Sequence, residues 1–463
     1  MKKVFLAILC LAFIVIPFSA CGDRREDVIP PPGGGKVDAT LSIAFFKGGY
    51  GDEWVRQIAT DFSAMKKEKD DLNIAVSLEG DSQMIELIAP RLNSGTQLAD
   101  IFFGDTKQWH QWASKGQLEP LDDLYATEIE NGETLADKID PNFAIYPKMN
   151  GTYYVVPWND GVTSLVYNKK MFSDYGWQVP ETVEQLKTLC AKIVSDAAPD
   201  IRPFTWAGQI GGGGGYWDFL TRGWWANYEG EENFKSFYKF ENAEVYQQQG
   251  RLKALEAFED LCVKNGSWAV SAIASKDHIK SQMDFVQGKA AMMPNGAWVE
   301  PEMKNSTPAG FEMAMMPLPK MTGTESGPNY NYTAAQDFAI IPKQAKNKAL
   351  AKEFLIFMNT EAMLQKYHKI TGSPRPFKYD YDAVTGLTGF QESVRDVYKN
   401  AVNVYSCSES PLHYKGYAIE WPGPKLPFTA MITDKKTALQ AFQDDYSFVS
   451  SRWPGWKIEL GIA

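Results

Sequence analysis

The first patterned stretch of the chain alternates short apolar runs with amphipathic segments. Residues 40–46 are β-branched and aromatic and end at the glycine-rich loop 47–51, which predicts a strand and a turn. Apolar residues then recur at helical spacing from Trp54 to Met65. Two further strands are predicted at residues 73–78 and 99–105, with a helix between them. Strands that alternate with helices predict a parallel sheet with helices on both faces.

Ligands of such sheets meet the loops at the carboxyl ends of the strands. The loops that follow the first and third predicted strands carry four candidate binding residues, Gly49, Tyr50, Asp105 and Trp109. The carboxylate of Asp105 has an alternative role as the cap of the next helix.

Later patterns predict a second set of elements. Apolar runs on either side of residues 158–161 (WNDG) predict a hairpin over residues 152–167, and helical spacing recurs at residues 251–262 and 348–358. Five consecutive glycines at positions 211–215 lack the Gly-Lys-Ser/Thr ending of a phosphate-binding loop. We interpret them as a flexible loop or as backbone that approaches a ligand closely.

The beginning of the chain has the pattern of an export signal. Two lysines precede the apolar run Val4 to Pro17, and Ser19-Ala20 stand directly before Cys21. We expect residues 1–20 to be a signal peptide and Cys21 to be lipidated. The alternatives are an ordinary cleaved signal that leaves a thiol, or an uncleaved anchor. The Pro- and Gly-rich residues 21–38 predict a flexible tether that follows the lipid.

Composition and charge narrow the function. A chain of 463 residues exceeds one typical core, so two domains are expected. The net charge of −10 makes nucleic acid and anionic lipid surfaces poor partners. Cys190, Cys262 and Cys407 have no metal-ligand spacing, and the four histidines are scattered. We therefore expect no metal site, no cofactor and no catalytic residue, and we leave one disulfide open.

Five motifs in order resemble the bacterial extracellular solute-binding protein family that includes maltose-binding protein. They are ADIFFGD with WASKGQLEPLDDL, then NGTYYVVPWNDGVTSLVYNKKMF with VPETVEQL, FVQGKAAMMPNGAW, FAIIPKQAKNKALAKEFLIFM and TGSPRP. The resemblance implies an α/β fold of type II with two periplasmic-binding-protein-like lobes. Each lobe is a sheet flanked by helices, and the ligand cleft lies between the lobes. It also implies that the protein is a subunit of an ABC importer whose partners are permease subunits in the membrane. We expect a monomer.

The same resemblance places three crossing segments near Pro157–Gly161, Thr333–Asp337 and Gly372–Arg375. The expected first lobe comprises residues 39–158 and 333–372, and the expected second lobe comprises residues 159–332 and 373–463. Glycine and proline at the crossings suit a hinge, where a few residues absorb a change in backbone angle.

A sugar site needs flat aromatic faces for the C–H surfaces and planar polar groups for the hydroxyls. In proteins similar to this chain, the tryptophan at the position of Trp298 stacks on the sugar; the alternative is a core tryptophan. Asn159 and Asp160 are expected to reach the solute from the hinge, or simply to form a turn. The remaining candidates are Trp158, Trp217, Trp224, Asn295, Asp337 and Arg375.

The sequence thus predicts a lipid-anchored protein on the extracytoplasmic face of the cell membrane that captures a carbohydrate, with an oligosaccharide favoured, for an ABC importer. A surface-anchored glycan-degrading enzyme and a glycan-binding protein without a transport role remain alternatives. The chain has no GxSxG motif or nucleophile with an orienting base, which favours binding over catalysis.

Overall fold

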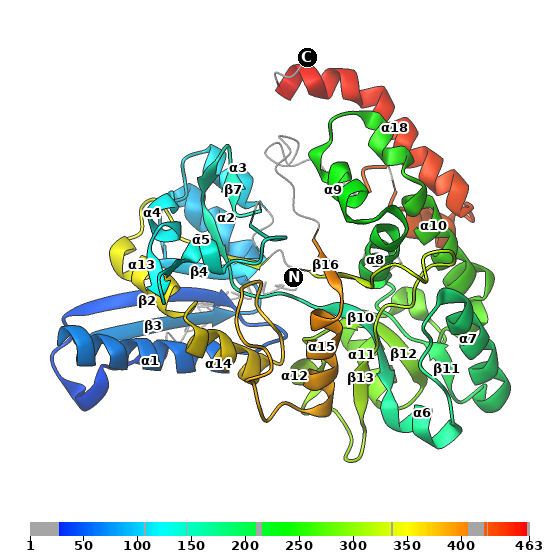
Figure 1. Cartoon of the computed structure of the whole chain (residues 1–463), viewed down its shortest axis with the longest axis horizontal. Helices are drawn as coiled ribbons and strands as arrows, with labels where there is room; N and C mark the ends of the chain where they lie inside the picture. Colours follow the sequence, from blue (N-terminus) through cyan, green and yellow to red (C-terminus); the bar gives the residue numbers. More distant parts are fainter. Residues whose placement is uncertain are drawn as a thin grey trace, which may run out of the picture.

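Two sheets with separate hydrophobic cores form two lobes that lie side by side along the longest axis of the molecule (Figure 1). The computed structural model describes residues 27–105, 108–144, 146–209, 215–334, 337–405, 421–423 and 425–460. The predicted signal peptide, Cys21 and Cys407 lie outside these residues, and so does most of the glycine run.

The first lobe is built on a six-stranded mixed sheet with the order β1-β3-β2-β4-β15-β9. Its strands are β1 (Asp27–Ile29), β2 (Ala39–Phe46), β3 (Ile74–Asp81), β4 (Ile101–Asp105), β9 (Val155–Pro157) and β15 (Asp337–Ile340). β2 is parallel to both β3 and β4, which confirms the parallel arrangement predicted for the first three strands. β1, β15 and β9 are antiparallel to their neighbours, so the chain returns to this sheet after leaving it.

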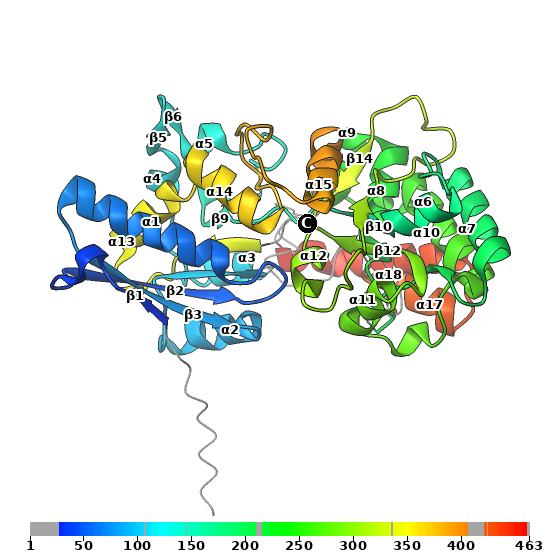
Figure 2. The ribbon, with the colours of Figure 1, turned by 90° about the horizontal axis from the view of Figure 1, so that it is seen from below.

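Helices cover both faces of this sheet. α1 (Glu53–Asp70) packs with α13 (Lys348–Phe357) and α14 (Glu361–Thr371), and α2 (Met84–Ser94) lies on the opposite face (Figures 1 and 2). Shorter elements complete the lobe: α3 (Trp109–Ser114), α4 (Asp122–Tyr125), α5 (Leu135–Lys138), β5 (Glu128–Glu130), β6 (Glu133–Thr134), β7 (Lys148–Met149) and β8 (Thr152–Tyr153).

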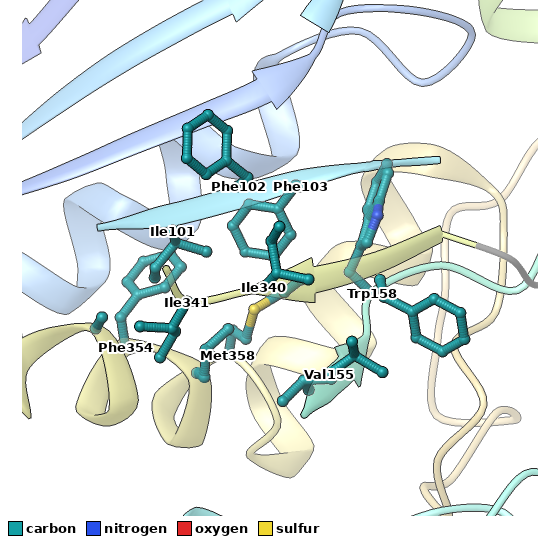
Figure 3. Packing of buried hydrophobic residues seen from close by; sticks show 14 of the residues in the cluster. Ile101, Phe102, Phe103, Val155, Trp158, Ile340, Ile341, Phe354 and Met358 are labelled. Carbon is teal, nitrogen blue, oxygen red and sulfur yellow. The ribbon is translucent and has the colours of Figure 1, made fainter. Parts of the chain in front are cut away.

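Aromatic and aliphatic side chains fill the core between the sheet and α13 (Figure 3). Trp158 stacks on Trp54 with ring centroids 5.0 Å apart, and Phe103 meets both rings edge-on. Burial of such rings supplies much of the apolar area that stabilises the lobe.

The second lobe contains a four-stranded sheet with the order β11-β12-β10-β13. Its strands are β10 (Thr163–Asn168), β11 (Arg202–Phe204), β12 (Ala290–Gly296) and β13 (Met313–Met315). Its helices are α6 (Lys169–Tyr175), α7 (Val183–Ala197), α8 (Trp217–Glu229), α9 (Glu231–Lys239), α10 (Gln249–Phe258), α11 (His278–Val286) and α12 (Val299–Met303). A π-helical segment, Glu259–Lys264, continues α10.

The predicted hairpin over residues 152–167 is wrong. β9 pairs with β15 in the first sheet, whereas β10 pairs with β12 and β13 in the second. The two runs are short and apolar in both settings, so local pattern does not distinguish a hairpin from strands in separate sheets.

The last part of the chain completes the second lobe. β14 (Tyr330–Tyr332) pairs in parallel with β16 (Val402–Val404), and α15 (Gly389–Lys399) packs on β13. α17 (Pro427–Thr433) and α18 (Ala438–Leu460) pack against α10. Phe377, Tyr379 and Val384, which the expected boundaries assign to the second lobe, lie in the first core.

Three further findings concern the cysteines, the membrane and metal binding. Cys190 and Cys262 are free and buried, and burial raises the pKa of both thiols. Among the described residues, no helix combines the length and apolarity needed to cross a bilayer. Nor do the described ranges bring together three or more His, Cys, Asp or Glu side chains in a metal-binding group.

Candidate functional site

Three chain segments pass between the lobes side by side and are joined by backbone hydrogen bonds. The N–H of Trp158 donates to the carbonyl of Asp337 at 3.2 Å, and the N–H of Ala334 donates to Gly161 at 2.8 Å. The N–H of Asp160 donates to the carbonyl of Pro374 at 3.2 Å. The first segment is therefore bonded to both of the others.

The carboxyl group of Asp160 is completely buried among these segments. The hydroxyl of Tyr405 donates to Oδ2 of Asp160 at 3.2 Å, and the hydroxyls of Thr333 and Tyr398 also face this carboxyl group. Burial raises the pKa of Asp160 to about 7, although the hydroxyls act in the opposite direction. Asp160 is thus a buried polar centre of the hinge, and its side chain has no exposed surface for a solute.

Tyr50 connects the loop after β2 to this centre. Its hydroxyl donates to Oγ of Ser373 at 3.1 Å, and Ser373 in turn donates to the backbone carbonyl of Asp160 at 2.8 Å. Burial raises the pKa of Tyr50, so this phenol stays neutral and acts as a donor. The relay couples a first-lobe loop to the crossing segments.

Asn159 and Asp337 form a second polar contact at the crossing. The Nδ2 group of Asn159 donates to Oδ2 of Asp337 at 2.5 Å. Asn159 is buried, whereas Asp337 is half-buried. The Oδ1 atom of Asn159 is buried and has no hydrogen-bond partner.

Trp298 lies where the two lobes touch. It comes directly before α12 and packs against glycines of three segments. A Cβ atom added at Gly49, in the first lobe, would lie 2.6 Å from Cβ of Trp298. A Cβ atom added at Gly161 would lie 3.2 Å from the indole ring, and one at Gly296 would lie 2.2 Å from it. Glycine at positions 49 and 296 therefore makes room for this half-buried indole.

Two aromatic rings of the second lobe contact Trp298, and a third packs behind them. The rings of Tyr216 and Phe219 meet it edge-on, with centroids 5.7 and 6.1 Å away. Phe219 stacks between Tyr216, at 5.1 Å, and Tyr332, at 5.9 Å. Tyr216, Phe219 and Trp298 are half-buried, so these rings retain exposed surface.

Glu302, one turn after Trp298, supplies a carboxylate to the same region. It accepts a hydrogen bond from Nε2 of Gln282 at 2.7 Å. Its charge also raises the pKa of Tyr216 and Tyr50, after the larger effect of burial in each case. Glu302 is therefore near both the aromatic group and the first-lobe loop.

We call the residues gathered at this junction the interlobe cluster: Gly49, Tyr50, Asn159, Asp160, Tyr216, Phe219, Trp298, Glu302, Asp337 and Ser373. The cluster combines partly exposed aromatic faces with carboxylate, amide and hydroxyl groups. This combination suits a ligand that has C–H faces and hydroxyl edges.

The structure places four candidate tryptophans elsewhere. Trp109 and Trp158 are buried in the core of the first lobe, and Trp217 and Trp224 are completely buried in the core of the second. Nε1 of Trp224 donates to the carbonyl of Pro319 at 2.9 Å, which satisfies its only polar group. Tryptophan can pack in a core or line a ligand site, and these four rings pack in cores.

Arg375 and Asn295 are buried beneath the junction and form hydrogen bonds with its backbone. Arg375 is fully buried and donates from Nη2 to the carbonyl of Pro157 and from Nη1 to that of Met358, each at 2.8 Å. Burial lowers the pKa of its guanidinium to about 10. Asn295 is buried and accepts the N–H of Gly296 at 2.8 Å, next to the turn that carries Trp298.

Asp105 ends β4 opposite Asp337, and its side chain lies outside the described atoms.

The sequence offered a signal for two residues that were missed. The core face of α8 carries Trp217, Leu220 and Trp224 at helical spacing. This spacing puts Phe219, and Tyr216 directly before the helix, on an adjacent face. No sequence pattern indicated Glu302 or Ser373, because their partners lie on distant segments.

The arrangement is that of a two-lobed solute receptor of type II, and solved structures of this class match it. The chain matches the GacH receptor of Streptomyces glaucescens with a TM-score of 0.66 and 18% identity, covering 90% of this chain and 98% of the receptor. It matches RafE from Streptococcus pneumoniae with a TM-score of 0.65 and 18% identity, covering 90% and 99%.

Residues 48–364 match the model of the family described as bacterial extracellular solute-binding protein, and the chain belongs to this family. The chain is 25% identical to the diacetylchitobiose binding protein NgcE of Streptomyces coelicolor, over 77% of this chain and 73% of that protein. It is 24% identical to the multiple sugar-binding protein of Streptococcus mutans, over 70% and 72%. The predicted family and fold class are confirmed.

Proposed function

We propose that this solute-binding protein captures a carbohydrate, with an oligosaccharide favoured, as the binding subunit of an ABC importer. The observation that carries the proposal is the position of Trp298. Its half-buried indole lies on the second lobe, touches Gly49 of the first and adjoins Tyr216 and Phe219. An aromatic face at this junction can contact a sugar, and the solute can then bind both lobes at once.

The names of several relatives support this choice of solute. They include proteins named for diacetylchitobiose, multiple sugars and maltotriose, and a structurally similar protein is in complex with raffinose. All of these names refer to carbohydrates, and most refer to short oligosaccharides.

We infer binding rather than catalysis. Asp160 is enclosed and bonded to hinge hydroxyls, and Asp337 accepts a bond from Asn159. Glycoside hydrolysis needs two carboxyl groups that flank the bond to be cleaved. The surface-anchored hydrolase would instead release reducing sugar from an oligosaccharide, which a reducing-end assay on purified protein measures directly.

The wider setting is part of the same proposal. The chain would act as a monomer with permease subunits in the membrane, held on the extracytoplasmic face by a lipid on Cys21. The lobes would comprise residues 39–158 with 333–372, and residues 159–332 with 373–463, apart from the segment around Phe377 that packs in the first core.

The test is calorimetric titration of the purified protein with diacetylchitobiose, maltotriose and raffinose. Trp298→Ala should weaken the affinity for the sugar that binds by at least tenfold, because it removes the stacking surface. Trp268→Ala is the matched control, since Trp268 is also half-buried but lies in a short helix of the second lobe outside the cluster. Equal affinities of wild type and Trp298→Ala would remove Trp298 from the site.

A further inference from the structure

A separate cavity of about 280 Å³ opens on the second lobe, and no residue of the interlobe cluster lines it. Its walls come from the segment after β13, from β14 and from the end of α15. Asp396 and Asn400 are exposed at its rim, so the cavity is open to solvent.

The cavity contains a buried polar group that lacks a partner. Asn331 is 1% exposed, and its Nδ2 group makes one long hydrogen bond, of 3.4 Å, to Oδ1 of Asn403. Oδ1 of Asn331 has no hydrogen-bond partner. An unsatisfied buried acceptor costs about 1–3 kcal/mol, so such a group calls for an explanation. A hydroxyl group of a bound molecule would satisfy it after the Asn331 side chain turns toward the cavity, because Oδ1 is enclosed in this structure.

The other lining groups restrict the chemistry of that molecule. Leu318 and Val397 form apolar walls. Tyr330 lines the cavity from β14, and its ring packs toward the second core, where its hydroxyl accepts the N–H of Glu231 at 3.1 Å. The carboxylate of Asp396 disfavours an anion and favours hydrogen-bond donors. Apolar walls with acceptors at the edges match a ring that carries hydroxyl groups.

The size of the cavity restricts the molecule further. A volume of about 280 Å³ lies just below the range for small-molecule sites, roughly 300–1,000 Å³. A single sugar ring suits such a volume, and an oligosaccharide would have to extend beyond it.

We propose that this cavity is a second binding site, which takes a single-ring sugar or a polyol of similar size. The site stands apart from the interlobe cluster and does not depend on what that cluster binds. It is also connected to the hinge. β14 leads directly to Thr333 and β16 to Tyr405, and both of these residues face Asp160.

The test follows the Asn331 side-chain amide by nuclear magnetic resonance in the full chain, with nitrogen-15 introduced only at asparagine. The signal of Asn331 is identified by its loss in Asn331→Leu. The probes are D-glucose, D-galactose and N-acetyl-D-glucosamine, each titrated to tens of millimolar. We expect at least one probe to shift the Asn331 signal with a saturating dependence on concentration.

Blocking variants separate local binding from an indirect effect of a sugar in the interlobe cluster. Ala401→Phe fills the cavity and keeps the reporter, and Asn400→Trp at the exposed rim does the same if the first variant unfolds. Each should weaken the response at least tenfold, whereas Asn305→Ala, at an exposed asparagine outside the cavity, should leave it unchanged. The proposal is overturned by the absence of a saturating shift with all three probes, or by a shift that persists in the blocked variants. Neither result bears on the Trp298 test.

Discussion

The carboxyl group of Asp160 shows how the tertiary setting changes the role of a residue. In the sequence it stands in an Asn-Asp-Gly turn, which is compatible with a solvent-exposed ligand-binding carboxylate. In the structure it is completely buried beside tyrosine and threonine hydroxyls. The neighbouring hydroxyls make Asp160 a hydrogen-bonding centre of the hinge, and its burial raises its pKa.

The raised pKa of Asp160 predicts a specific dependence of stability on pH. A carboxyl group with a pKa of about 7 in the folded state and about 4 in the unfolded state binds its proton more tightly when folded. Its contribution to stability is therefore present in full below the unfolded pKa and is lost as the pH rises through 7. Between pH 5 and pH 8, wild type should lose on the order of 1–3 kcal/mol more than Asp160→Asn.

Urea unfolding of both proteins at several pH values measures this difference. Asparagine keeps the size and much of the polarity of the side chain but does not titrate, so other ionisable groups cancel in the comparison. A difference between the two proteins that stays constant with pH would contradict the raised pKa.

At the scale of elements, the loop after β2 and the turn before α12 are in tight contact at Gly49 and Trp298. Gly49 has no positive φ angle, so its backbone would accept a larger residue. The obstacle is Trp298, because an added Cβ would lie 2.6 Å from Cβ of that residue. Contact between the lobes, rather than the local backbone, requires glycine here.

Gly49→Val should therefore weaken solute affinity at least tenfold and change the melting temperature little. The side chain would hold the loop away from Trp298 and disturb the contacts that the solute makes with both lobes. Gly266→Val is the control, since nothing lies within 4 Å of a Cβ atom added there. Calorimetry with the bound sugar measures the effect, and equal affinities of the two variants would refute this account of the contact.

Helix α18 is fixed to the second lobe by a buried ion pair. Nη2 of Arg251, in α10, lies 3.1 Å from Oδ2 of Asp445, in α18, and both side chains are almost fully buried. The guanidinium also lies 4.8 Å from the ring centroid of Trp421 and 5.3 Å from that of Trp225. The pair therefore ties the last helix to the core.

Arg251→Met should lower the free energy of unfolding by about 3–5 kcal/mol, because it leaves the carboxylate of Asp445 buried without its partner. Adding Asp445→Leu should restore part of the loss. Arg452→Met, at an exposed arginine of α18, the helix that carries Asp445, should cost less than about 1 kcal/mol. Urea unfolding compares the variants, and similar losses for Arg251→Met and Arg452→Met would contradict the role of the pair.

At the scale of the whole molecule, the sequence predicts a lipid on Cys21 and a flexible tether over residues 21–38. The second half of this prediction is wrong from residue 27 onward, because β1 (Asp27–Ile29) pairs with β3 in the first sheet. A lipid on this cysteine would hold the protein on a membrane through burial of its acyl chains, at about 0.8 kcal/mol per methylene. The flexible residues expected between the lipid and β1 would leave the lobes free to open and close.

Cys21→Ala should move the protein from the membrane fraction to the soluble exported fraction. Cys190→Ala is the control, because Cys190 is buried in the second lobe and should not affect anchoring. Fractionation followed by immunoblotting measures the distribution. Membrane retention of Cys21→Ala would contradict lipidation.

The amino-acid pattern by itself determined several elements of the first lobe and the family. Alternating apolar runs gave β2, β3 and β4, helical spacing gave α1 and α13, and the ordered motifs indicated a two-lobed solute receptor. These features depend on neighbours in the chain, so they can be recognised locally. Trp298 and Asp337 were predicted from motif and crossing positions, and Tyr50 from its place in the loop after the first predicted strand.

Only the tertiary structure decided which side chains gather between the lobes. Trp158 and Trp298 are the same residue type beside similar glycine turns, yet one is buried in a core and the other is half-buried at the junction. Ser373 meets Tyr50 across 323 positions of the chain. Long-range packing sets such contacts, and neither local periodicity nor residue type specifies them.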